Sequence, residues 1–197
     1  MRRLLTVGLL VAAVCAADAH AARAQGSATL YHTYGPNGQG DDLSRAFLSF
    51  RAGEADVKEQ GEKEDLAFGL LQIGGEDWFQ VVNGSDGSGR SVIRDLGPHD
   101  WDNDLVFPAL APLPELKPGE QRTVTVDASA DTHGKWAKAT TTFAKVRIGH
   151  IYAVRVVRGD TDLYALFRVE AHEQNESCKI TWRIVPAPAE AADWRMR

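Results

Sequence analysis

Residues 177–185 read SCKITWRIV, and this alternation of apolar and polar side chains decides the fold class. One face of the stretch carries Cys178, Ile180, Trp182 and Ile184, whereas the residues between them are polar or charged. A repeat of two residues is the periodicity of a β-strand with one buried face, because successive side chains point to opposite faces of a sheet. The stretch therefore predicts a strand whose apolar face lies in the core.

Two earlier stretches, 151–157 and 163–169, show the same alternation. Arg-Gly-Asp at 158–160 separates these two stretches, and Glu-Gln-Asn-Glu at 173–176 separates the second one from the strand that follows. Short polar turns of this kind are typical of hairpins between neighbouring strands. Residues 146–185 therefore predict an antiparallel meander.

Shorter strand patterns extend toward the N-terminus. Residues 66–73 and 78–82 flank a Gly-Gly turn signal, and the glycine-rich loop 83–89 leads into a further strand at 90–95. Thr and Val alternate once more at 122–127. Many short strands at turn spacing are typical of a sandwich or a barrel. The sequence predicts an all-β fold: an antiparallel β-sandwich, immunoglobulin-like or jelly-roll-like, with at most one or two short helices.

Three segments are less regular. Residues 41–51 fit a helix capped by Asp41 or Asp42, and equally a strand at 47–50. The strongly charged segment 54–65 predicts a solvated loop. Prolines recur between Phe107 and Gly119, which predicts an extended connector with little helix.

This connector leads into a recognisable pattern. Leu116–Glu120 reads LKPGE and precedes the Thr/Val alternation of Thr123–Val126. A Pro-Gly turn before a Thr/Val strand resembles a common feature of immunoglobulin-like bacterial sandwich domains. The resemblance covers about a dozen residues and implies only a fold, because such folds carry many unrelated functions.

The N-terminal segment predicts an export signal. A basic start, Met1-Arg2-Arg3, precedes the apolar run Leu4–Ala17, and small residues follow it. This is the layout of a secretory signal peptide, and the apolar run is too short for a membrane span of about 20 residues. We expect cleavage after Ala24, or alternatively after Ala21. The protein is then secreted or periplasmic, with no transmembrane segment after signal removal.

The expected domain organisation follows from this leader. Residues 1–24 form the signal peptide, 25–186 form a single β-sandwich domain, and 187–197 form a flexible C-terminal tail. A division into two domains near residue 110 is the alternative, although halves of that size would be marginally stable.

Removal of the leader changes the charge and the cysteine count. Three arginines and one aspartate are lost, so the formal net charge goes from −5 to −7. This acidic balance argues against nucleic acid as a partner. Cys178 is the one cysteine that remains, so the exported chain contains no internal disulfide. Its position on the predicted core face disfavours a nucleophilic role.

The sharpest polar cluster reads HDWDND, in which Asp100, Asp102 and Asp104 occupy alternate positions. Calcium takes six to eight oxygen ligands, so these carboxylates predict a calcium site. The EF-hand pattern is not met, and the site needs a further ligand such as Asp86 or Asp95. A solvated acidic loop is the alternative. The sequence predicts no cofactor apart from this calcium, and no histidine pair has zinc-helix spacing.

Recognition is expected at the loops 83–89 and 97–104, which bracket the strand 90–95. The candidate ligand-binding residues are Trp101, Asp86 and Trp136. Trp136 lies in a polar stretch and is the best candidate for an exposed tryptophan, since Trp78, Trp101 and Trp182 fit core positions and Trp194 belongs to the tail.

The function class remains open between three expectations. The first is an exported, non-catalytic β-sandwich that binds an envelope or extracellular protein or glycan. The second is a metal- or carboxylate-dependent secreted hydrolase built around His99, Asp100, Asp102 and Asp104. The third is an envelope structural protein without a small ligand. Catalysis is the less favoured reading, because the sequence contains no complete catalytic constellation.

Overall fold

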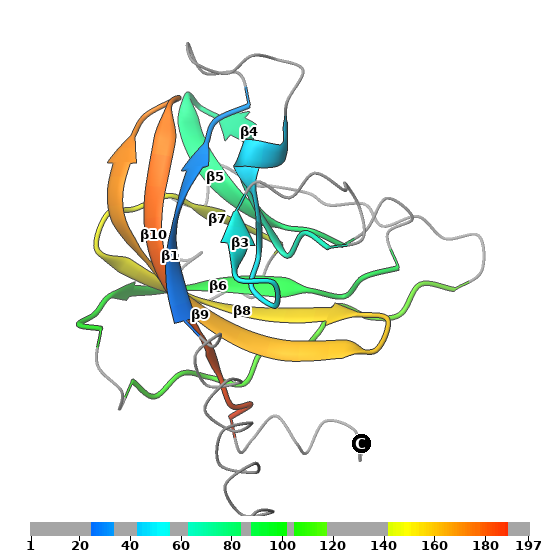
Figure 1. Ribbon diagram of the computed structural model, residues 1–197. Coiled ribbons are helices and arrows are strands. Elements are labelled where there is room, and N and C mark those ends of the chain that lie inside the picture. The colour runs from blue at the N-terminus through cyan, green and yellow to red at the C-terminus, as the bar shows by residue number, and fades with distance from the viewer. Residues whose placement is uncertain are drawn as a thin grey trace, which may run out of the picture.

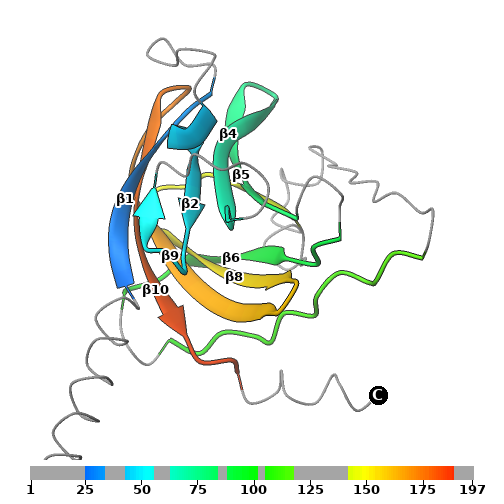
Figure 2. The ribbon, with the colours of Figure 1, turned by 45° about the vertical axis from the view of Figure 1, so that its right-hand side comes forward.

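The computed structural model describes residues 25–33, 43–55, 63–83, 88–101, 105–117 and 142–188. Within these ranges the chain forms two antiparallel five-stranded sheets. Figures 1 and 2 show the larger, strongly curved sheet wrapping around the smaller one. The prediction of an all-β antiparallel sandwich is therefore confirmed.

The larger sheet, sheet A, has the strand order β1-β10-β9-β8-β6. Its strands are β1 (Gln25–Tyr31), β6 (Val92–Pro98), β8 (His150–Arg158), β9 (Thr161–Glu173) and β10 (Ser177–Val185). The last three follow one another in the chain and pair antiparallel, so the predicted meander is confirmed. β10 has the bounds that the alternating pattern predicts, because a half-buried strand ends where its alternation ends.

The smaller sheet, sheet B, has the strand order β3-β2-β4-β5-β7. Its strands are β2 (Phe47–Ser49), β3 (Glu54–Ala55), β4 (Leu66–Ile73), β5 (Glu76–Val81) and β7 (Phe143–Lys145). The Gly-Gly turn lies between β4 and β5, as predicted. The segment 41–51, for which the sequence allowed a helix or a strand, contains both: a single 3-10 turn, η1 (Leu43–Ala46), is followed directly by β2.

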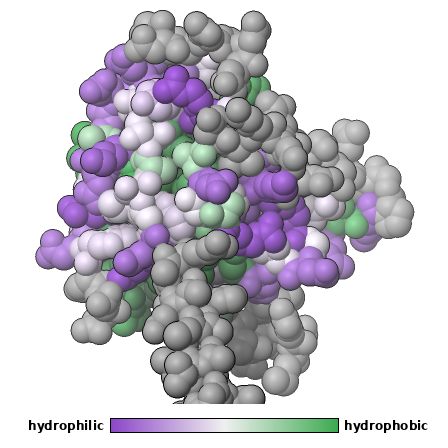
Figure 3. Space-filling view, viewed as in Figure 1, coloured by the Kyte–Doolittle hydropathy of each residue, from purple (hydrophilic) through white to green (hydrophobic). Residues whose placement is uncertain are grey.

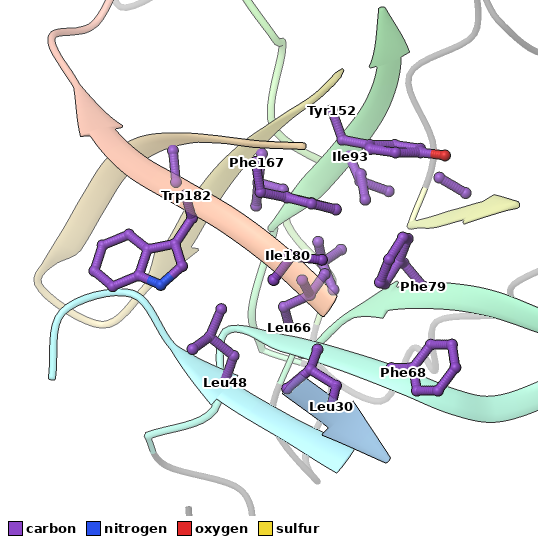
Figure 4. Close-up of a cluster of buried hydrophobic side chains, with 14 of the residues drawn as sticks. Leu30, Leu48, Leu66, Phe68, Phe79, Ile93, Tyr152, Phe167, Ile180 and Trp182 are labelled. Carbon is purple, nitrogen blue, oxygen red and sulfur yellow. The ribbon is translucent and has the colours of Figure 1, made fainter. Parts of the chain in front are cut away.

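The main core lies between the two sheets and is rich in aromatic rings (Figure 4). Phe167 of sheet A stacks on Tyr152 with a centroid distance of 4.8 Å and meets Phe79 of sheet B edge-on at 4.9 Å. The apolar face of β10 faces this core, with Cys178, Ile180 and Trp182 buried. Period-two patterning predicted this face correctly.

The outer face of sheet A carries a second apolar cluster. Ile151, Ala153, Tyr164 and Leu166 are buried there under an irregular, extended segment, residues 105–117, which we call the strap. Leu110 of the strap is fully buried in this cluster. Figure 2 shows the strap as the green trace that runs below the sheet. The predicted extended connector is thus confirmed for its described residues, and it covers a sheet face.

Polar contacts attach the strap to sheet A. Arg155 donates from Nη1 to the Leu110 carbonyl at 2.8 Å, and the Tyr164 hydroxyl donates to the same oxygen at 3.3 Å. Arg155 is itself held by Asp162, whose two carboxylate oxygens lie 2.9 and 2.8 Å from Nε and Nη2. The buried Leu110 carbonyl is therefore hydrogen-bonded without a strand ladder.

The predicted solvated loop over 54–65 is wrong at both described ends. Glu54–Ala55 forms β3, and the Asp65 side chain is 0% exposed. Its carboxylate accepts a hydrogen bond from the Phe50 amide at 2.8 Å, and Arg158 Nη2 lies 3.4 Å away. Burial raises the pKa of Asp65, against these contacts. Asp65 is buried here, although its neighbours in the sequence are strongly charged, because a long-range cation reaches its carboxylate.

Several predictions concern residues outside the described ranges. These are the signal peptide 1–24, the strand and the resemblance-bearing turn within 118–141, and most of the tail 187–197. Among the described residues no helix reaches the length and hydropathy of a membrane span. On the face drawn in Figure 3, hydrophilic and intermediate residues dominate the coloured surface.

Candidate functional site

The structure describes two of the six predicted site residues, Trp101 and Asp100. Trp101 is half-buried against the outer cluster, and the Arg183 guanidinium lies 4.8 Å from its ring centroid. Asp100 is exposed. The other four residues, Asp86, Asp102, Asp104 and Trp136, lie outside the described ranges.

The two loops expected to carry recognition lie at opposite ends of β6. This strand has seven residues and therefore spans about 20 Å. The loop 83–89 precedes it, and the segment 97–104 begins at its far end. A single small ligand cannot touch both loops at that separation, so each loop is a separate candidate.

A hollow of about 430 Å³ lies at the 83–89 end. Three separate segments line it: Ser88 and Arg90, then Glu115 and Leu116 of the strap, then Val157, Arg158 and Gly159 at the β8–β9 turn. Its walls are mostly polar, with Leu116 and Val157 as the apolar part. A volume of a few hundred Å³ is the size range of small-molecule sites.

Arg90 has a rigid backbone at this hollow. Its amide donates to the Val157 carbonyl at 2.8 Å, and its carbonyl accepts from the Leu113 amide at 3.1 Å. Its guanidinium Nη1 lies 3.1 Å from Oε1 of Glu115. The Arg90 side chain is 21% exposed, whereas that of Glu115 is 80% exposed. The arginine is therefore built into the wall, and the glutamate reaches it from solvent.

Arg158, the second cation of the hollow, is held by contacts with the buried residues Glu64 and Asp65. Nη1 donates to the Glu64 carbonyl at 2.9 Å, and Nη2 lies 3.4 Å from the buried Asp65 carboxylate. These contacts tie the end of β8 to the segment before β4 and hold Arg158 in place in the lining of the hollow.

A second polar cluster joins the two sheets inside the core. Asp77 of β5 is completely buried; its Oδ2 accepts from His172 Nε2 at 2.8 Å and from the Asn175 amide at 2.8 Å. His32 Nε2 lies 3.4 Å from the other oxygen, Oδ1. The rings of both histidines meet Phe68 edge-on. We call these three residues, His32, Asp77 and His172, the core carboxylate cluster.

The charges of this cluster are set by opposing effects. Burial pushes the pKa of Asp77 up, but the hydrogen bond from His172, the Asn175 amide and the attraction of His32 outweigh it, so the pKa is lowered. Burial lowers the pKa of His32, and Asp77 opposes this only in part. The arrangement is an ionised carboxylate between two imidazoles that bonds elements of both sheets.

A third cluster lies where β6 meets the start of β8. His150 Nδ1 lies 2.9 and 3.0 Å from the two carboxylate oxygens of Asp95, which also accepts from the Gly97 amide at 2.8 Å. Asp95, named above as a possible calcium ligand, thus already holds an imidazole. The ring of His99 contacts the Leu96 carbonyl at 2.9 Å.

The described residues offer little to the metal and thiol hypotheses. Within the described ranges no group of three or more His, Cys, Asp or Glu side chains is placed to hold a metal ion. Asp102 and Asp104 lie outside those ranges, so the calcium site stays a prediction. Cys178 is a buried free thiol, and burial raises its pKa far above the ordinary value. It is therefore a poor nucleophile in the folded protein.

Sequence patterns do not single out Arg90, Glu115 or Arg158, because three segments far apart in the chain bring them together. The one available signal was the glycine-rich loop 83–89, whose Ser88 lies at the hollow. No protein-family model matches this chain, and no curated protein or solved structure is similar enough to it to count as a match.

Proposed function

We propose that this chain is an exported, non-catalytic binding protein of the cell envelope or the extracellular space. Its ligand is held in the hollow between Arg90, Glu115 and Arg158. The observation that carries the proposal is this hollow of about 430 Å³ with two arginines in its wall.

The wall of the hollow is preorganised, which favours binding. Arg90 is held by backbone hydrogen bonds on both sides, and Arg158 is held by a carbonyl and a buried carboxylate. A ligand that binds to groups already held in place has a higher affinity, because less conformational entropy of the protein is lost on binding. The hollow also lies at one end of the sandwich where loops meet, which is the usual place for recognition on a rigid scaffold.

A blocking variant tests the proposal. Ser88→Trp places an indole at the mouth of the hollow, whereas Ser27→Trp, at an exposed position of β1 on the opposite edge of sheet A, is the matched control. Thermal melts of the purified exported protein are recorded with a panel of neutral and acidic sugars, peptides, calcium, zinc and chelator. A ligand at 100 times its Kd stabilises the protein by about 2.7 kcal/mol, which a melt detects.

We expect at least one sugar or peptide to raise the Tm of the wild type and of Ser27→Trp, but not that of Ser88→Trp. A ligand that stabilises all three proteins equally would place binding elsewhere. A panel without any effect would contradict the proposal and favour a structural role. A shift with calcium alone would instead support the acidic loop at Asp100.

A further inference from the structure

The ion pair between Arg90 and Glu115 indicates which class of ligand the hollow binds. We propose that its ligand carries an oxyanion, a carboxylate, sulfate or phosphate group on a small carbon framework, and that this group pairs with Arg90 in place of Glu115. The inference rests on the proposed function and specifies the ligand class of the same site.

Arg90 suits an oxyanion because of its chemistry and its placement. A guanidinium is planar, always charged, and presents donors that match carboxylate, sulfate and phosphate oxygens in pairs. The Arg90 side chain is 21% exposed, and the Arg90 backbone is hydrogen-bonded to β8 and to the strap. A charge-assisted bond in a partly desolvated wall is stronger than one at an open surface.

Glu115 already shows how an oxyanion sits on this arginine. Its Oε1 lies 3.1 Å from Arg90 Nη1, yet its side chain is 80% exposed and extends from the irregular end of the strap. An exposed ion pair of this kind contributes little, because solvent screens it and the long side chain loses rotamer freedom. A ligand oxyanion that also contacts the walls displaces Glu115 at small cost.

Arg158 fits a different role. Its two Nη groups already serve the Glu64 carbonyl and the Asp65 carboxylate, so its charge is largely met within the protein. We therefore place the oxyanion of the ligand at Arg90, where Glu115 already pairs with the guanidinium, and not at Arg158. Leu116 and Val157 supply the apolar part of the lining, which favours an anion on a carbon ring over a bare inorganic ion.

Three anionic sugars and one neutral sugar test the proposal. Glucuronate, glucose 6-sulfate and glucose 6-phosphate separate the three oxyanions, and glucose is the uncharged match. Titration calorimetry or ligand-observed NMR with the wild-type protein is expected to show binding of at least one anionic sugar, with glucose at least about tenfold weaker, since loss of a charged partner costs that much or more. Raising the salt concentration should weaken only the anionic ligand.

Two substitutions should then act in opposite directions. Arg90→Gln removes the cation and lowers the affinity for the anionic sugar by about tenfold or more. Glu115→Gln removes the competing carboxylate and raises the affinity several-fold. Arg90→Lys keeps the charge without the paired donors, so its affinity lies between the wild type and Arg90→Gln. Glu115 is exposed, so Glu115→Gln remains informative even where Arg90→Gln does not fold.

A charge pair elsewhere provides the matched control. Arg168 and Glu170, whose atoms Nη1 and Oε2 lie 3.7 Å apart, belong to the distant half of β9. Arg168→Gln and Glu170→Gln should leave the affinity unchanged. One outcome would contradict the oxyanion inference alone: a ligand that Ser88→Trp excludes, but that binds the wild type, Arg90→Gln and Glu115→Gln with equal affinity. The hollow would then still be the binding site. Binding that survives Ser88→Trp overturns the proposed function itself.

Discussion

Asp77 is a carboxylate held between two imidazoles at the contact of the two sheets. It belongs to β5 of sheet B, whereas His172 belongs to β9 of sheet A. Ionisation of this group, which has no exposed surface, is stabilised by two hydrogen bonds to Oδ2, from His172 and from the Asn175 amide. The core carboxylate cluster therefore couples the stability of the sandwich to pH.

The sign of this coupling follows from the two lowered pKa values. The folded protein keeps Asp77 ionised to a lower pH than the unfolded chain does, so its contribution is present above about pH 4 and is lost as the pH falls through its folded pKa. His32 acts in the same direction: its pKa is lowered, so the unfolded chain binds the proton first and stability begins to fall below about pH 6.5.

We predict that Asp77→Asn lowers the free energy of unfolding by about 2 kcal/mol at pH 7, since a buried charged hydrogen-bond acceptor is lost. The variant also loses the part of the acid dependence below about pH 4 that Asp77 contributes. Urea unfolding between pH 7 and pH 3.5 measures both effects. Asp160→Asn, at an exposed turn position, is the control and should match the wild type. Parallel stability curves for wild type and Asp77→Asn would contradict this role.

Gly69 is a residue whose side chain is excluded by its surroundings. Its φ is +67°, and an added Cβ would lie 2.4 Å from Cδ2 of His32. Gly74 has a similar φ of +66° but open space around it. We predict that Gly69→Ala costs about 3 kcal/mol or more, from backbone strain and overpacking together, and Gly74→Ala only about 1–2 kcal/mol. Equal losses in denaturant unfolding would show that the His32 contact is unimportant.

At the scale of elements, the strap covers the outer face of sheet A although it forms no strand. Leu110 is fully buried, and its carbonyl accepts hydrogen bonds from Arg155 and Tyr164. The strap also supplies Glu115 and Leu116 to the hollow. A change that loosens the strap should therefore affect both stability and the candidate site.

We predict that Leu110→Ala lowers the free energy of unfolding by about 3 kcal/mol, because it leaves a cavity against the sheet. Val106, which is 92% exposed on the same strap, is the matched control; Val106→Ala should change stability by less than about 0.5 kcal/mol. Limited proteolysis should cut the strap faster in Leu110→Ala than in Val106→Ala. Similar cutting of both variants would mean that Leu110 does not hold the strap.

At the scale of the whole molecule, strands from both halves of the sequence are mixed in each sheet. β6 precedes residue 110 but pairs with β8 in sheet A, and β7 follows residue 110 but pairs with β5 in sheet B. A division into two domains near 110 would cut both sheets. The single domain over 25–186 stays a prediction, and the unfolding behaviour of the protein tests it.

We predict one cooperative unfolding transition for residues 25–197. Tryptophan fluorescence, to which Trp78 and Trp182 contribute from buried positions and Trp101 from the outer cluster, should change together with far-ultraviolet circular dichroism. Two separated transitions would indicate that the strap and outer cluster, or a second domain, unfold independently.

The stretches of alternating apolar and polar residues were enough to predict three strands of sheet A. Ser177–Val185 forms β10, and residues 151–157 and 163–169 lie within β8 and β9. The face that Cys178 shares with Ile180, Trp182 and Ile184 predicted its burial correctly. A period of two in hydrophobicity can be recognised from the local sequence, whatever the strand packs against, because a strand with one apolar face must bury that face. The sequence by itself therefore settled the fold class and the meander.

Tertiary structure alone decided which charged residues are buried and which of them meet at the hollow. Asp65 belongs to a segment that local composition assigns to solvent, yet Arg158, 93 positions away, holds it in the interior. Arg90, Glu115 and Arg158 likewise form the hollow from three segments without a shared motif. Charge burial and binding sites depend on partners brought together by folding, and a linear pattern contains no record of those distances.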